Sequence, residues 1–239
     1  MDEFPPPADP VRLRARLETV RARIEAACRR AGRSGADVTL VAVTKNRPPA
    51  DVDALHALGV ADVGENRIRE ALAKAPRTSA PVRWHLVGSL QRNKARKALS
   101  LFSAFHSADS PELLEALDRI LGEGEPPRAP SPFPVLVQVN VSGEETKHGL
   151  AGDDVLPFLE RFASLRNLRA AGLMTMAPYS DDPGDARPHF ARLAALARDA
   201  ARHGLLPDPP GLSMGMSGDF ETAVEEGATW VRIGSALFT

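Results

Sequence analysis

The chain has 239 residues, of which 43% are hydrophobic and 26% are charged, an ordinary composition for a globular protein with a sizeable core. Its formal net charge of -1 gives no basis for a nucleic-acid or membrane-surface partner. A single cysteine excludes an intramolecular disulfide and a cysteine-based metal cage. Residues 1–10 are acidic and proline-rich, unlike a secretory signal, and no apolar run approaches the roughly 20 residues of a membrane span. We therefore expect a cytoplasmic protein without a metal site.

The first periodic segment, residues 11–31, predicts an amphipathic helix. Asp9 is placed to cap its N-terminus, Pro10 suits the first helical position, and Gly32 suits the end. Arginines fill the other faces, and interleaved glutamates favour a solvated surface over an RNA-binding one. Its apolar stripe consists of Leu13, Leu17, Val20, Ile24 and Ala27.

After this helix, apolar runs typical of strands alternate with helical patterns. The expected strands are residues 38–43, 62–64, 83–87, 104–107, 135–141, 169–176, 211–216 and 230–233. The expected helices are residues 51–58, 68–75, 91–101, 111–121, 153–165, 188–203 and 220–226.

Eight strands alternating with helices predict an α/β fold, a single (β/α)8 TIM-type barrel with an additional N-terminal helix. We expect one domain over residues 1–239, with residues 1–32 as an extension and helix that pack on the barrel. No helix is predicted after the eighth strand, so the N-terminal helix is expected to fill that gap. A doubly wound sheet is disfavoured because the segment after the first strand lacks the usual glycine fingerprint.

In such a barrel the functional groups gather at the carboxyl ends of the strands. Lys45 directly follows the apolar first strand, which would place its amine at the barrel mouth, partly desolvated. Burial lowers the pKa of a lysine, and a neutral amine can attack an aldehyde. The alternative is a lysine at a strand end that extends to solvent. Position alone leaves both interpretations open.

Small residues follow the seventh and eighth strands and predict a phosphate site. Ser213, Ser217, Gly234 and Ser235 stand where barrels often bind phosphate through backbone N–H groups. Ser217 or Asp219 is expected to cap the helix that follows. Ordinary tight turns would explain the glycines of these segments but not the paired serines.

Two further side chains are expected to point into the barrel. Arg232 alternates with outward-facing neighbours and needs a partner, because an unpaired buried charge is costly. That partner is a ligand ring nitrogen, a phosphate or a carboxylate such as Glu65. His85 on the third strand fits either a hydrogen-bonded core histidine or a ligand contact. No histidine, aspartate or glutamate spacing forms a metal site.

Six segments together resemble the pyridoxal phosphate homeostasis protein family. The resemblance implies a barrel like the N-terminal domain of alanine racemase, with pyridoxal 5'-phosphate (PLP) bound as a Schiff base on Lys45. The segments are LVAVTKNRP (40–48), VGENRIREAL (63–72), WHLVGSLQRNKAR (84–96), VNVSGEETKHGL (139–150), GLMTMAP (172–178) and LSMGMSGDFETAVEEGATWVRIGSALF (212–238).

The resemblance also implies the remaining contacts with PLP. Arg232 would face the pyridine nitrogen and, unable to accept a proton, would leave it mostly neutral. Asn66 and His85 would line the pocket. The phosphate would be held by Ser213, Gly234 and Ser235, with backbone around Gly215 and Ser217. The sequence departs from the family at Ser89, where proline is expected, at Gly218, a frequent aspartate, and at His148, which leaves the strand-five loop open.

The function implied by the resemblance is non-catalytic. The chain would buffer PLP and deliver it through transient contacts with PLP-dependent apoenzymes, and we expect a monomer. The rival is an amino-acid racemase, which needs two bases on opposite faces of the cofactor; Tyr179 and His85 are candidates for the second. A phosphosugar-binding barrel without PLP is a third interpretation, in which Lys45 is unexplained unless it forms a Schiff base with a sugar.

Overall fold

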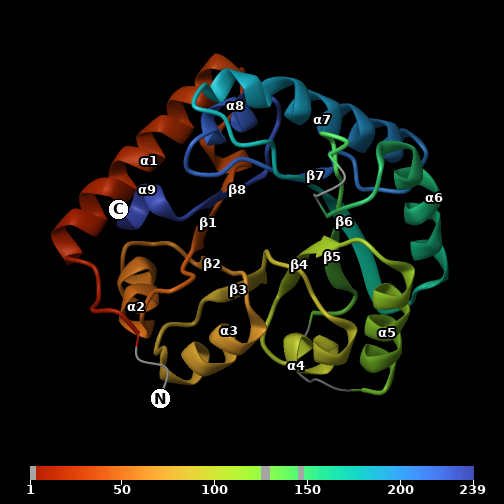
Figure 1. The fold of residues 1–239 in the computed structure, drawn as a ribbon, viewed down its shortest axis with the longest axis horizontal. Coiled ribbons are helices and arrows are strands. Elements are labelled where there is room, and N and C mark those ends of the chain that lie inside the picture. Colours follow the sequence, from red (N-terminus) through yellow and green to blue (C-terminus); the bar gives the residue numbers. More distant parts are fainter. Residues whose placement is uncertain (1–3, 125–129, 145–147) are drawn as a thin grey trace.

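The structure is a computed structural model that describes residues 4–124, 130–144 and 148–239. Residues 145–147, within the segment 139–150 that carries the family resemblance, therefore lie outside the described residues. The chain forms a closed barrel of parallel strands in sequential order, ringed by helices, which confirms the predicted fold (Figure 1). The strands are β1 (Thr39–Val43), β2 (Asp62–Glu65), β3 (Arg83–Leu86), β4 (Ala104–Ala108), β5 (Phe133–Gln138), β6 (Leu168–Met174), β7 (Gly211–Ser213) and β8 (Trp230–Ile233).

The helices cover the outside of the barrel and bury its outward-facing side chains. Among the described residues none of them is both long and apolar enough to cross a membrane. They are α1 (Pro10–Arg30), α2 (Pro49–Ala57), α3 (Ile68–Lys74), α4 (Ala95–Leu99), α5 (Pro111–Gly122), α6 (Val155–Glu160), α7 (Arg187–Arg202), α8 (Phe220–Glu225) and α9 (Ser235–Phe238).

Helix α1 packs along α8 and α9, in the position expected for it (Figure 1). Its apolar stripe is buried, and the Asp9 carboxylate accepts hydrogen bonds from the amides of Val11 and Arg12 at 2.9 Å. Arg23 and Arg30 pair with carboxylates of α8. The arginine-rich face of α1 therefore serves in part to attach the helix to the barrel.

One expectation about the end of the chain was wrong. A short helix, α9, does follow β8, where none was predicted. The amides of Gly234, which precedes α9, and of Ala236 within it donate to the hydroxyl of Ser217, at 3.3 and 3.1 Å. Four residues are too few to show helical periodicity, so the sequence pattern had no signal for this turn.

Strand β7 is shorter than predicted, because the backbone leaves the extended conformation at Gly215, where φ is +88°. A Cβ at Gly215 would lie 2.5 Å from the Cβ of Ala223. Glycine is therefore required here both for the left-handed backbone and for the close approach of α8.

The interior of the barrel is divided into two kinds of surface. One part is apolar and is formed by Leu136, Ala171 and Met174, against which Trp230 packs. The other part is polar and contains His85, His106, Ser213 and Arg232, all buried. A TIM-type barrel is usually filled by branched aliphatic side chains. Polar side chains in place of aliphatic ones therefore indicate that this part of the interior serves the functional site.

The cap of α1 gives a direct test of its contribution to stability. Asp9→Ala leaves two amides of the first turn without their acceptor and should cost about 1 kcal/mol, or roughly 2–4 °C in Tm. Asp154→Ala is the matched control, because Asp154 precedes α6 without accepting a capping hydrogen bond. Thermal melting checks both variants. Equal Tm values for the two would show that the Asp9 cap does not stabilise the docked helix.

Candidate functional site

Lys45 lies at the mouth of the barrel, in a turn directly after β1. It is exposed, and the next residue, Asn46, has φ of +58°. Lys45 lines a cavity of about 310 Å³ at the carboxyl ends of the strands. The other residues that line the cavity are Val43, Asn66, Val87, Met176, Met216, Ser217, Gly218, Arg232, Gly234 and Ser235.

Six of the nine site residues predicted from the sequence meet at this cavity: Lys45, Asn66, Ser217, Arg232, Gly234 and Ser235. The β1–β8 pairing brings Lys45 beside Arg232, Gly234 and Ser235. In this pairing Val41 lies opposite Arg232, and Ala42 lies opposite Ile233. His85, Ser213 and Gly215 do not line it.

A buried ion pair fixes the turn that carries Lys45. The ammonium of Lys74 donates to a carboxylate oxygen of Glu65 at 2.5 Å and to the backbone carbonyl of Thr44 at 2.7 Å. The Thr44 hydroxyl donates to the same oxygen of Glu65 at 2.6 Å. Both charged side chains are 0% exposed, and burial raises the pKa of Glu65 against the opposing effect of Lys74.

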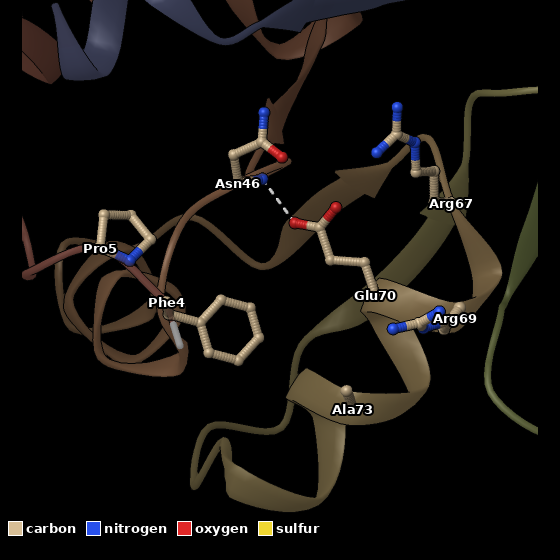
Figure 2. A pocket seen from close by; sticks show the side chains of 7 residues that line it. All are labelled: Phe4, Pro5, Asn46, Arg67, Arg69, Glu70 and Ala73. Carbon is tan, nitrogen blue, oxygen red and sulfur yellow. Dashed lines mark hydrogen bonds between the residues drawn. The ribbon is translucent and has the colours of Figure 1, made fainter. Parts of the chain in front are cut away.

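The other side of the turn is held by Glu70, whose carboxylate accepts a hydrogen bond from the backbone N–H of Asn46 (Figure 2). The same oxygen lies 3.3 Å from the Lys74 ammonium. The residues before and after Lys45 are therefore both anchored to α3. Glu65, considered above as a partner for Arg232, pairs with Lys74 instead.

A second cavity, of about 400 Å³, lies beside this turn and includes Asn46 in its lining; its side chains are drawn in Figure 2. It lies between the N-terminal segment at Phe4 and Pro5 and the helix α3, and Arg67 and Glu70 contribute to its wall. Lys45 does not line it. The amine of Lys45 is therefore associated with the cavity at the barrel mouth.

Backbone amides at the ends of β7 and β8 offer hydrogen bonds to an anion. Within the described part of the chain, the N–H groups of Ser217, Gly218 and Ser235 donate to no other residue. All three residues line the cavity. The Asp219 carboxylate accepts from the amide of Met216 at 2.6 Å rather than from the first turn of α8. These amides form a small-residue rim that suits a phosphate group.

Arg232 is buried and forms the inner wall of the cavity. Its guanidinium donates to the hydroxyl of Ser213 at 2.7 Å and to the backbone carbonyl of Thr175 at 2.9 Å. Burial lowers the pKa of Arg232 to about 10, and the Asp219 carboxylate opposes this effect. The guanidinium therefore stays charged at neutral pH.

His85 and Ser213 lie behind Arg232, in the barrel interior. The His85 ring is hydrogen-bonded to Asp62 at 2.8 Å and to His106 at 3.0 Å, and His106 is bonded to Ser213 at 2.8 Å. His85 is thus a hydrogen-bonded core histidine. Sequence reasoning did not single out His106, although its place next to the apolar Phe105, which packs in the outer core, was a signal for its inward position on β4.

The remaining polar candidates, Tyr179 and His148, do not line the cavity. Tyr179 is 93% exposed, and its hydroxyl donates to Asp181 at 3.0 Å. His148 is exposed, and its backbone carbonyl accepts a hydrogen bond from the side chain of Gln138. Neither residue lines the cavity that contains Lys45.

Comparison with known proteins matches this chain to the family model described as alanine racemase, N-terminal domain, over residues 15–239. A pyridoxal phosphate homeostasis protein of Pseudomonas aeruginosa is 43% identical over 223 residues, which cover 93% of each chain. The human protein of the same name is 34% identical and covers 83% of this chain and 75% of its own.

Solved structures agree with the fold. PipY of Synechococcus elongatus, with PLP bound, has a TM-score of 0.80 and 35% identity, and the match covers 95% of this chain and all of PipY. D-threonine aldolase from Filomicrobium marinum has a TM-score of 0.77 at 19% identity, and the match covers 98% of this chain and 61% of the aldolase. At that identity the likeness concerns the fold alone.

The buried pair beneath the turn gives a stability prediction. Lys74→Met leaves the Glu65 carboxylate buried without a cation, so unfolding should require about 3 kcal/mol less than in the wild type. Lys97→Met is the control, because Lys97 is exposed and its loss should change stability by no more than about 0.5 kcal/mol. Urea denaturation measures both. A Lys74→Met protein as stable as the control would show that the ion pair contributes nothing to stability.

Proposed function

Because this chain belongs to the family of pyridoxal phosphate homeostasis proteins, we propose that it binds PLP as a Schiff base on Lys45. The observation that carries the proposal is the convergence of a lysine amine, a buried guanidinium and a rim of unbonded amides on one cavity. PLP supplies an aldehyde that reacts with a primary amine, a phosphate and a pyridine ring. The cavity offers a matching group for each.

We assign the phosphate to the amides of Ser217, Gly218 and Ser235, with the hydroxyl of Ser235 as a further donor. Gly234, between β8 and α9, allows the backbone of this rim to lie close to the anion. Ser213 and Gly215, expected at the phosphate, contribute indirectly: Ser213 bonds Arg232, and Gly215 allows α8 to approach. Asn66 also lines the cavity.

Arg232 is assigned to the pyridine nitrogen. A guanidinium only donates hydrogen bonds. It therefore does not keep that nitrogen protonated, as a neighbouring carboxylate would. A neutral ring nitrogen makes the cofactor a weaker electron sink. This environment suits retention of PLP better than chemistry that depends on carbanions.

We therefore propose a carrier that buffers PLP and delivers it to apoenzymes, without catalytic turnover. A racemase needs a second base opposite Lys45. The Tyr179 hydroxyl is bonded to Asp181 outside the cavity, and His85 lies behind Arg232 in the core. Both positions support the carrier over the racemase.

The proposal includes a cytoplasmic monomer that contacts PLP-dependent apoenzymes transiently. Large apolar side chains exposed on the described surface are few: Val11, Met176, Tyr179 and Met216. Two of them, Met176 and Met216, line the cofactor cavity. So little exposed apolar surface supports a monomer, because stable interfaces bury large apolar side chains.

Lys45→Ala tests the site of attachment. The wild-type protein with PLP should absorb near 400 nm and, after borohydride reduction and peptide mapping, carry the label on Lys45. The Ala variant should lose the label yet retain weak binding through the phosphate rim. Lys94→Ala is a control lysine outside the cavity and should label like the wild type. A wild-type label on another lysine contradicts the assignment, and the absence of any band favours the phosphosugar interpretation.

Ser235→Ala tests the phosphate rim. Loss of one hydroxyl donor to a charged phosphate should weaken PLP retention about tenfold and leave the label on Lys45. Ser164→Ala, at an exposed serine that does not line the cavity, is the control. Equilibrium dialysis against graded PLP concentrations measures retention. Equal retention by the two variants would contradict the assignment of Ser235.

A further inference from the structure

A continuous row of buried polar side chains crosses the barrel interior beneath the cavity. It runs Asp62, His85, His106, Ser213 and Arg232, from the start of β2 to the site, and we call it the polar row. Its four hydrogen bonds measure 2.8, 3.0, 2.8 and 2.7 Å in that order. Five strands contribute one residue each, so the row spans residues from 62 to 232.

The hydrogen bonds of the row are all directed the same way when both imidazoles are neutral. An ionised Asp62 only accepts, so Nε2 of His85 carries the hydrogen. Nδ1 of His85 then accepts from Nε2 of His106, whose Nδ1 in turn accepts from the Ser213 hydroxyl. Ser213 receives the N–H of Arg232.

The charge states along the row are consistent with hydrogen bonds that are donated from Arg232 toward Asp62. Burial raises the pKa of Asp62, but the hydrogen bonds from His85 and Arg83 outweigh it, so its pKa lies below the usual value. Burial, with His85 and Arg232 nearby, holds the pKa of His106 well below the usual value. The row therefore has an anion at one end, a cation at the other and a neutral imidazole at His106 between them.

The row solves a particular problem for Arg232. A buried guanidinium needs partners, and a carboxylate beside it would compete with a ligand for its N–H groups. Here two of its nitrogens are occupied by Ser213 and by the carbonyl of Thr175, both neutral, and the carboxylate that interacts with its charge is that of Asp219. Arg232 is also one of the residues that line the cavity.

The row is also fully bonded. Among the described residues, the buried side-chain atom without a hydrogen-bond partner is Oε2 of Glu65, and no atom of the row shares that condition. Burial of five polar side chains is costly compared with an aliphatic barrel core and is tolerated when every member is satisfied. Such a complete network is suited to fixing one side-chain orientation.

We propose that Asp62, His85, His106 and Ser213 are positioning residues that fix the guanidinium of Arg232 toward the pyridine ring of the bound cofactor. The inference rests on the proposed function and deepens it. The row holds Arg232 through the neutral hydroxyl of Ser213, so the guanidinium would be kept in one orientation as a donor toward the ring nitrogen. Affinity and the spectrum of bound PLP both depend on that contact.

The test compares His106→Leu with His106→Gln. Leucine interrupts the row, whereas the amide of glutamine can accept from Ser213 and donate to His85. His106→Leu should retain the label on Lys45 but bind PLP about tenfold more weakly, with a shifted absorbance band. His106→Gln should return both to near wild-type values. His203→Leu, on an exposed histidine bonded to Asp199, is the control.

Ser213 gives an independent second comparison if His106→Leu does not fold. Ser213→Ala removes the hydroxyl that joins His106 to Arg232, and Ser213→Thr keeps it. Thermal melting reports folding, and equilibrium dialysis with the absorbance spectrum reports the site. The Ala variant should lose about tenfold in PLP affinity and shift the band, and the Thr variant should not.

The outcomes separate the two proposals. If Leu and Gln at position 106, or Ala and Thr at position 213, bind PLP equally and share one spectrum, the row does not position Arg232 and the inference is overturned. A wild-type protein without a reducible label on Lys45 contradicts the proposed function itself. A labelled wild-type protein with unaffected row variants contradicts the positioning role alone.

Discussion

The parallel pairing of β1 with β8 is the interaction on which the candidate site depends. It closes the barrel and places the residues after Val43 beside those after Ile233, although nearly the whole chain separates them. Lys45 comes from one strand end, and Gly234 and Ser235 from the other. If this pairing were lost, the amine and the phosphate rim would no longer share a cavity. The attachment of α1 to α8 and α9 covers the outside of this same closure.

Two sets of buried charges then give the mouth its shape, and they do so differently. Lys74 and Glu65 form a direct ion pair that anchors the turn before Lys45, where no ligand is expected to compete for them. Arg232 is held instead by neutral partners, the hydroxyl of Ser213 and the carbonyl of Thr175, and its charge interacts with the Asp219 carboxylate. A direct pair suits a fixed support, and neutral hydrogen-bond partners suit a group that must still bind a ligand.

Much of the fold and part of the site were predictable from the sequence. The alternation of apolar runs and helical stripes predicted the barrel, because strands buried on both faces and amphipathic helices have distinct periods. The motifs around Lys45 and Ser235 pointed to the mouth. The short helix α9 and the true length of β7 were not predictable, since four-residue elements and a left-handed glycine leave no periodic trace.

The sequence by itself determined which residues end each strand, and therefore which side chains gather at the functional face. Only the tertiary structure decided which of them line the cavity and which lie behind it. It paired Glu65 with Lys74 rather than Arg232, and it put His85 and Ser213 into a row with the unforeseen His106. The physical reason is that strand periodicity tells only whether a side chain points inward. Its depth and its partners follow from the register between strands, which involves residues far apart in the chain.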